Sequence, residues 1–64
     1  MTPAEYIIAM RLQADMGQVE LASRADLSQS AISKYERGEL VPDLDTFVRI
    51  LKVFGYELKV KEVK

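Results

Sequence analysis

Two short helical patterns lie only three residues apart in this 64-residue chain, and their closeness limits the fold more than any other feature. Residues 18–25 ("QVELASRA") carry apolar residues at helical spacing, and residues 29–37 ("QSAISKYER") do so again. A connection of three residues is too short for either helix to build a core of its own, so the two are expected to pack against each other. The sequence therefore predicts a small helical domain organised around this pair.

Capping signals set the ends of four predicted helices. Thr2 and Glu5 form a capping box at the start of the first helix, in which each side chain accepts a hydrogen bond from the other residue's backbone N–H. Ser28 and Asp43 are the predicted N-caps of the third and fourth helices, and Gly38 suits the left-handed turn that ends the third. The predicted helices cover residues of about 3–15, 18–25, 29–37 and 44–54.

Apolar residues at helical spacing give the predicted core. The first helix carries one apolar stripe of Ile7, Met10 and Ala14. The other predicted core residues are Val19, Leu21, Ala22, Ala25, Ile32, Tyr35, Leu44, Phe47, Val48, Leu51 and Phe54. A domain of this size buries only about 60% of its unfolded surface, and the chain has no Cys for a disulfide. Oligomerisation is therefore the expected source of extra stability.

The tail from residue 56 onward changes to a period of two, which predicts a β-strand. Its apolar residues are Tyr56, Leu58 and Val60, and its charged residues are Glu57, Lys59 and Lys61. A lone strand leaves backbone groups unpaired and is not stable in water, so we expect this strand to pair with its copy in a second subunit. Residues 62–64 are expected to fray.

The first helix has a second apolar stripe, Ile8 and Leu12, about 100° around the helix from the first. Val53 is likewise predicted to point away from the main face of the fourth helix. The predicted dimer contacts are therefore Tyr56, Leu58, Val60, Ile8, Leu12 and Val53. The expected fold is mainly α, with a four-helix domain at residues 1–55 and a strand and tail at residues 56–64 that join a homodimer.

Two short helices joined by a three-residue turn, with the small residue Ala22 where they cross, match the geometry of a helix-turn-helix. In that motif, the N-terminal residues of the second helix meet base edges in the major groove. Gln29 and Ser30 occupy this position, and Gln makes paired hydrogen bonds to adenine. For an arbitrary helix, these would simply be polar residues in a solvent-facing first turn.

A longer pattern supports the DNA-binding interpretation. Its members are Gln18, Leu21-Ala22, Ser28, Ile32-Ser33, Glu36-Arg37-Gly38 and Pro42. With these spacings, roughly residues 6 to 55 resemble the helix-turn-helix domain of the Cro and Xre family, which includes phage repressors and is lambda-repressor-like in fold. The resemblance implies sequence-directed binding of double-stranded DNA.

The resemblance also implies roles for individual residues. The expected base contacts are Gln29, Ser30, Ser33 and Lys34, and the expected phosphate contacts are Gln18, Gly17, Ser28, Arg37 and Arg24. Arg24, Lys34 and Arg37 are equally explained as solvated charges, and Gly17 offers only its backbone where the family often has Ser or Thr. In such domains, an arginine of the first helix pairs with the glutamate that closes the third, and the matching residues are Arg11 and Glu36.

Composition argues against several other functions. The absence of Cys and His removes thiolate chemistry and the usual zinc ligands, and no Ser has a His as its base, so no enzyme, cofactor, metal or small-molecule substrate is expected. No apolar run is long enough for a membrane span, so a cytoplasmic protein is expected. The formal net charge of −1 counts against DNA binding, because phosphate binding usually brings a basic excess.

Three functions remain open at this stage. The first is a homodimeric transcriptional repressor that binds an inverted repeat and has no effector domain. The second is an antitoxin that represses its own operon and binds a toxin protein, because the small acidic chain and the predicted C-terminal strand resemble HipB-type antitoxins. The third is a protein-interaction module that has lost DNA binding, which the net charge and the acidic loop after residue 38 favour.

Overall fold

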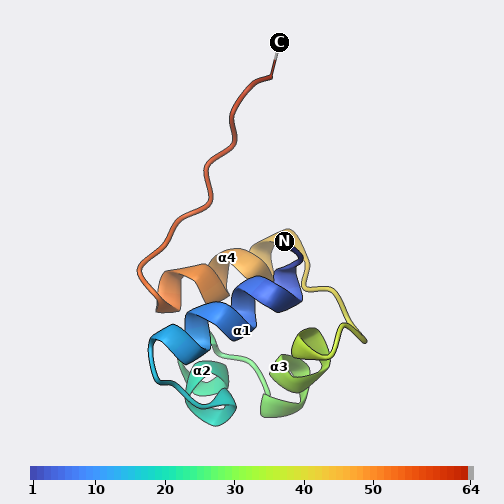
Figure 1. Ribbon diagram of the computed structural model, residues 1–64, viewed down its shortest axis with the longest axis vertical. Coiled ribbons are helices and arrows are strands. Elements are labelled where there is room, and N and C mark those ends of the chain that lie inside the picture. Colours follow the sequence, from blue (N-terminus) through green and yellow to red (C-terminus); the bar gives the residue numbers. More distant parts are fainter. Residues whose placement is uncertain (64) are drawn as a thin grey trace.

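The computed structural model describes residues 1–63, so Lys64, the last residue of the predicted tail, lies outside the described residues. The four helices are α1 (Pro3–Gln13), α2 (Gln18–Ala25), α3 (Gln29–Glu36) and α4 (Leu44–Val53). In Figure 1, α2 and α3 lie together at one end of the molecule, α1 and α4 cross its middle, and the tail extends away from the opposite end. The helix pair and the tail are therefore on opposite sides of the α1 and α4 layer.

The predicted caps are present. The backbone N–H of Glu5 donates to the Thr2 hydroxyl at 3.2 Å, and the backbone N–H of Thr2 donates to the Glu5 carboxylate at 3.2 Å. At α3 and α4, the side chains of Ser28 and Asp43 accept hydrogen bonds from backbone N–H groups of the first turn at 3.0 and 2.8 Å. These bonds satisfy donors that a helix leaves free at its N-terminus, so the short helices begin where the sequence predicts.

The helix ends differ slightly from the prediction. α2 ends at Ala25 as predicted, whereas α1 ends at Gln13, two residues early, and α3 and α4 each end one residue early. The cause in α1 is Asp15, whose φ of 53° is left-handed and cannot continue the helix. Asp26 ends α2 in the same way, with a φ of 56°.

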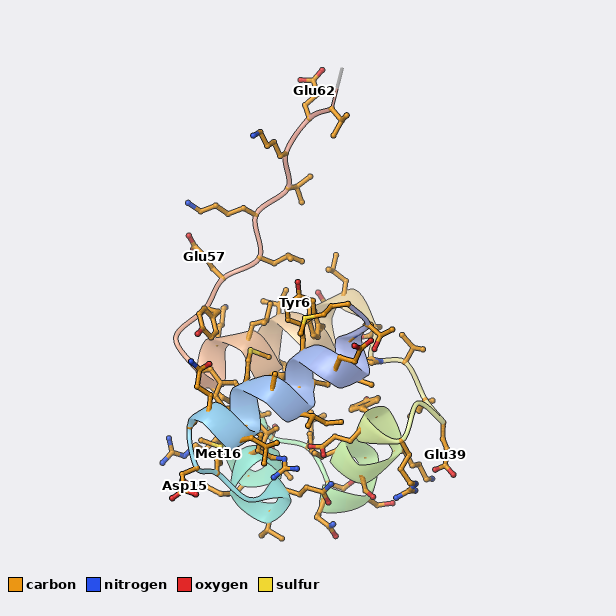
Figure 2. The ribbon with its side chains drawn as sticks, in the orientation of Figure 1. Tyr6, Asp15, Met16, Glu39, Glu57 and Glu62 are labelled. Atoms are coloured by element: carbon orange, nitrogen blue, oxygen red, sulfur yellow. The ribbon has the colours of Figure 1, made fainter. Side chains whose placement is uncertain are left out.

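The core lies where α1, α2, α3 and α4 meet. Its buried residues are Ile7, Met10, Met16, Leu21, Ala22, Ala25, Ile32, Tyr35, Ile50 and Leu51. The side chains of Phe47 and Tyr6 join α4 to α1 at one edge, with ring centroids 6.5 Å apart in an edge-to-face arrangement. Figure 2 shows Tyr6 on the side of the molecule from which the tail extends.

Three core predictions are wrong. Val19 and Leu44 are 70% and 64% exposed, and Ala14, at the C-cap of α1, is also exposed. Ile50, which was not predicted, is fully buried. Helical spacing identifies the side of a helix on which a residue lies, but it does not say whether another element lies opposite that turn.

Residues 56–63 form no strand within the single chain, so the predicted strand is not supported by this structure. The backbone N–H of Tyr56 still donates to the carbonyl of Leu51 at 3.0 Å, but the side chain of Val60 is 94% exposed. A strand requires a backbone partner, and no segment within residues 1–63 forms one with the tail. The tail thus alternates apolar and charged residues in sequence, but residues 1–63 of the single chain provide no sheet for it to join.

The other predicted dimer contacts divide into two groups. Leu12 is 64% exposed, as a residue available to a partner should be. Ile8 is only half-buried, and Val53 packs against the core, so Val53 does not point away from it as predicted. The second apolar stripe of α1 is therefore narrower than the sequence pattern indicates.

Candidate nucleic-acid interface

The turn between α2 and α3 is built from local hydrogen bonds. After Asp26 reverses the chain, the backbone N–H of Leu27 donates to the carbonyl of Ala22 at 2.8 Å, and Ser28 then caps α3. Ala22 and Ile32 are buried between the two helices. This packing leaves the first turn of α3, which begins with Gln29, exposed to solvent.

A path of side-chain hydrogen bonds connects Gln29 to the interior of the domain. The Nε2 of Gln29 donates to the Oε1 of Gln18 at 2.9 Å, and the Nε2 of Gln18 donates to the Oε1 of Glu36 at 3.2 Å. Glu36 in turn accepts hydrogen bonds from Arg11 Nε at 2.7 Å and from Arg11 Nη2 at 2.9 Å. The first residues of α2 and α3 are thus tied to the last residue of α3 and to α1.

The Arg11 and Glu36 side chains are only 17% and 8% exposed. Burial raises the pKa of the Glu36 carboxyl, but hydrogen bonds from Arg11 and Gln18 outweigh burial, and the pKa is lowered overall. The same pairing raises the pKa of Arg11. Arg11 also donates from Nη1 to the carbonyl of Met16 at 3.1 Å, so the pair holds the loop before α2 as well as the end of α3. Such a shielded, bidentate pair fixes geometry more than it adds net stability.

The remaining predicted base contacts lie on α3 in different environments. Ser30 and Lys34 are exposed, and Ser33 is half-buried. The Ser33 hydroxyl accepts a hydrogen bond from Arg37, and Lys34 forms no salt bridge with a residue of the described chain. Lys34 therefore keeps its charge available on the same helix as Gln29.

The predicted phosphate contacts are mostly engaged within the chain. Arg24 pairs with Glu20 at 2.7 Å, and Arg37 pairs with Glu39 at 2.6 Å, a contact that lowers the pKa of Glu39. Both pairs are about half exposed, so solvent competes for them and each contributes little stability. These arginines can therefore exchange a carboxylate for another anion at small cost.

Two predicted phosphate contacts use the ends of helices. Gly17 is the N-cap of α2 with a φ of −79°, and its position has no side-chain capping bond. The free N–H groups of this first turn are suited to an anion. The Ser28 hydroxyl accepts from the backbone N–H of Ala31 at 3.0 Å as the cap of α3, and its own O–H can still donate to an anion.

Arg49 is a structural residue that the sequence analysis missed. Its guanidinium donates to the carbonyl of Ala25 at 2.8 and 3.1 Å and to the carbonyl of Asp26 at 2.8 Å. It thereby satisfies carbonyl groups at the end of α2 from a position on α4. The signal in the sequence was a cation within an apolar helix.

Among residues 1–63, no group of acidic side chains is arranged to hold a metal ion. None of the four helices is long and apolar enough to cross a membrane.

Comparison with known proteins agrees with this geometry. A protein-family model described as helix-turn-helix matches residues 7–60, which include all of α2, α3 and α4 and most of α1. The search of curated proteins and the search of solved structures gave no match.

Proposed function

Because the chain belongs to the Cro and Xre family of helix-turn-helix proteins, which are DNA-binding transcription regulators, we propose that it is a repressor that acts as a homodimer on an inverted repeat. The observation that carries the proposal is the hydrogen-bonded path from Gln29 through Gln18 to Glu36. The hydrogen bond to Gln18 restricts the Gln29 side chain before DNA binds. Less conformational entropy is then lost when Gln29 contacts a base, which favours selective contact.

In this proposal, α3 enters the major groove with its first turn against the bases. Gln29 and Ser30 contact base edges, and Ser33 and Lys34 extend the contact along the helix. The N-terminus of α2 meets the phosphate backbone. The phosphate contacts are Gln18, Gly17, Ser28, Arg24 and Arg37. Since only Arg24 and Arg37 among these contacts carry a charge, and each must leave a carboxylate partner, we expect a shallow salt dependence of affinity.

Selection of bound sequences from random DNA tests the DNA-binding role. The full chain should enrich an inverted repeat whose half-sites lie about 34 Å apart, one turn of DNA. The Gln29→Ala variant should lose preference at one base per half-site, with a cost of about 1–3 kcal/mol per half-site. Lys34→Ala should weaken binding to all DNA sequences equally if Lys34 contacts phosphate. Failure of the full chain to enrich any sequence would contradict the proposal.

The dimer is proposed to form through the tails. Residues 56–63 leave the body on the side away from α2 and α3, so paired tails would lie over two domains that stand side by side on DNA (Figure 1). Pairing would also supply the backbone partner that the tail lacks.

The tail sequence favours one register for this pairing. Two antiparallel strands related by a two-fold axis perpendicular to their sheet pair residues that lie on the same face. With Leu58 on the axis, Tyr56 meets Val60 of the second copy on one face, and Glu57 meets Lys59 of the second copy on the other. A shift of one residue along each strand would instead place Lys59 opposite its own copy, which like charge disfavours.

Single cysteines test the tail dimer, because the natural chain has no Cys that could interfere. Residues opposite each other in an antiparallel pair have Cα atoms about 4.5–5.5 Å apart, within disulfide range. Leu58→Cys should therefore form a covalent dimer under mild oxidation, and Lys59→Cys should form little. Equal cross-linking of both variants, or a full chain that sediments as a monomer, would contradict this arrangement.

A second candidate function, an antitoxin that also binds a toxin protein, is favoured by an apolar groove on the side of the molecule away from α2 and α3. The groove has a volume of about 530 Å³ and is lined by residues that include Tyr6, Met10, Phe47, Leu51 and Leu58. A protein bound there would leave α3 free for DNA. Co-purification of a second protein that the Phe47→Glu variant fails to retain would support this function over a simple repressor.

A third candidate, an interaction module without DNA binding, is favoured by the two arginines already paired with carboxylates. The selection experiment separates it from the others, since such a module would enrich no sequence with or without a co-purified partner.

A further inference from the structure

The hydrogen bonds around Gln18 have a fixed direction. An ionised carboxylate only accepts hydrogen bonds, so Gln18 must turn its NH₂ group toward Glu36, where Nε2 lies 3.2 Å from Oε1. The carbonyl oxygen of Gln18 then faces the other way, and it accepts the Nε2 of Gln29 at 2.9 Å. The charge of Glu36 therefore decides the orientation of two successive carboxamides.

This orientation determines what Gln29 presents to solvent. With one N–H committed to Gln18, Gln29 has its carbonyl oxygen and one remaining N–H free, one acceptor and one donor. The opposite orientation would commit the oxygen and leave two N–H donors. A Gln without a fixed neighbour would offer either pattern at little cost.

We propose that Glu36, acting through Gln18, is a positioning residue for base specificity that makes Gln29 prefer adenine to guanine. In the major groove, adenine offers the N6 donor and the N7 acceptor, which match one acceptor and one donor, whereas guanine offers two acceptors, N7 and O6. The inference rests on the proposed function, in which Gln29 contacts a base.

A purely structural role for Glu36 does not require this arrangement. The bidentate bonds from Arg11, at 2.7 and 2.9 Å, already join α3 to α1. The bond from Gln18 is additional, and it leads outward to the exposed end of α3. Base preference thus separates the two roles, since a structural residue affects the affinity for all sequences together.

The Glu36→Gln variant tests the proposal, because a carboxamide at this position can turn either its oxygen or its nitrogen toward Gln18. Selection from random DNA should show the adenine-over-guanine ratio at the Gln29 position falling about fivefold or more. The matched control is Glu5→Gln, which makes the same change of charge at the far capping box, where Gln is also compatible with capping. It should keep the parent ratio.

A second variant guards against misfolding of Glu36→Gln, which also weakens the contact with Arg11. Gln18→Met keeps an unbranched side chain of similar length and leaves the Arg11–Glu36 pair intact, and it should lower the same ratio. The proposal is overturned if folded variants of both kinds keep the parent ratio, or if the parent prefers guanine at the position that Gln29→Ala affects. If the parent enriches no sequence, or Gln29→Ala changes no preference, the proposed function fails first and the inference fails with it.

Discussion

The helix pair and the tail differ in where their polar groups find partners. In the helix pair, the side chains of Gln29, Gln18 and Glu36 are linked to one another and to Arg11 within the chain. In the tail, only the first backbone N–H, that of Tyr56, has a backbone hydrogen-bond partner within residues 1–63. The polar side chains of the proposed DNA-contacting surface thus find their partners within one chain, whereas most backbone groups of the tail find none among the described residues.

The same contrast holds for the ion pairs. The Arg11–Glu36 pair is bidentate and shielded, with side chains 17% and 8% exposed, whereas Lys59 and Glu57 lie 3.7 Å apart with side chains 82% and 74% exposed. Coulomb attraction is weakened by water and salt at the second pair but much less at the first. Only the first pair is therefore expected to hold a fixed geometry.

The largest expected difference between the two regions is in core packing. Ile32 in α3 is fully buried, and Ile32→Ala should lower the free energy of unfolding by about 2–5 kcal/mol. Val63 in the tail is 91% exposed, and Val63→Ala should leave the free energy unchanged. Denaturant titration of both variants measures the difference. A cost at Val63 similar to that at Ile32 would show that the tail is packed in solution.

A smaller difference is expected between the two glutamates. Glu36→Ala leaves the shielded Arg11 without its partner and should cost about 3 kcal/mol. Glu57→Ala removes an exposed pair and should cost less than about 1 kcal/mol. Thermal unfolding of the two variants compares them directly, and retention of the parent midpoint by Glu36→Ala would contradict the structural role of the pair.

The smallest effect is expected in the pH dependence of stability. Because the folded-state pKa of Glu36 is lowered from its ordinary value of 4.5, its ionisation stabilises the fold fully above that value. This contribution is lost as pH falls through the lowered folded-state pKa. The free energy of unfolding of the Glu36→Gln variant should therefore decrease less steeply than that of the parent as pH is lowered from 7 to 3.

Other carboxyl groups keep the unfolding free energy of this variant dependent on pH in the acid range. Hydrogen bonds with Thr2, Arg37 and Thr46 lower the pKa values of Glu5, Glu39 and Asp43 respectively. The slope should thus decrease without disappearing. An unchanged slope would mean that Glu36 is not ionised within the Arg11 pair.

The starts of α1, α3 and α4 were predictable because caps act over three residues. Thr2, Ser28 and Asp43 each bond to a backbone N–H in the adjoining first turn, so the sequence alone places them. The left-handed residue Asp26 was also predictable from its residue type. These features need no information about the rest of the chain.

The errors arose where a distant element decides the outcome. Leu44 and Leu51 lie on one side of α4 by spacing, yet only Leu51 is buried, because burial depends on what packs opposite each turn. Arg49 was missed because its partners belong to α2, 23 and 24 residues earlier in the chain. A strand was predicted for the tail although its partner is not within the described chain.

By itself, the sequence determined four helices, three of which begin with a capping side chain, the close pairing of α2 with α3, and the placement of Gln29 at the start of the second helix of that pair. Only the tertiary structure decided that Gln18 lies between Gln29 and Glu36. It also decided that Arg24 and Arg37 have acidic partners. The physical reason is range: caps and turns are bonds between near neighbours in the chain, whereas the direction of a carboxamide depends on a charge that folding brings next to it.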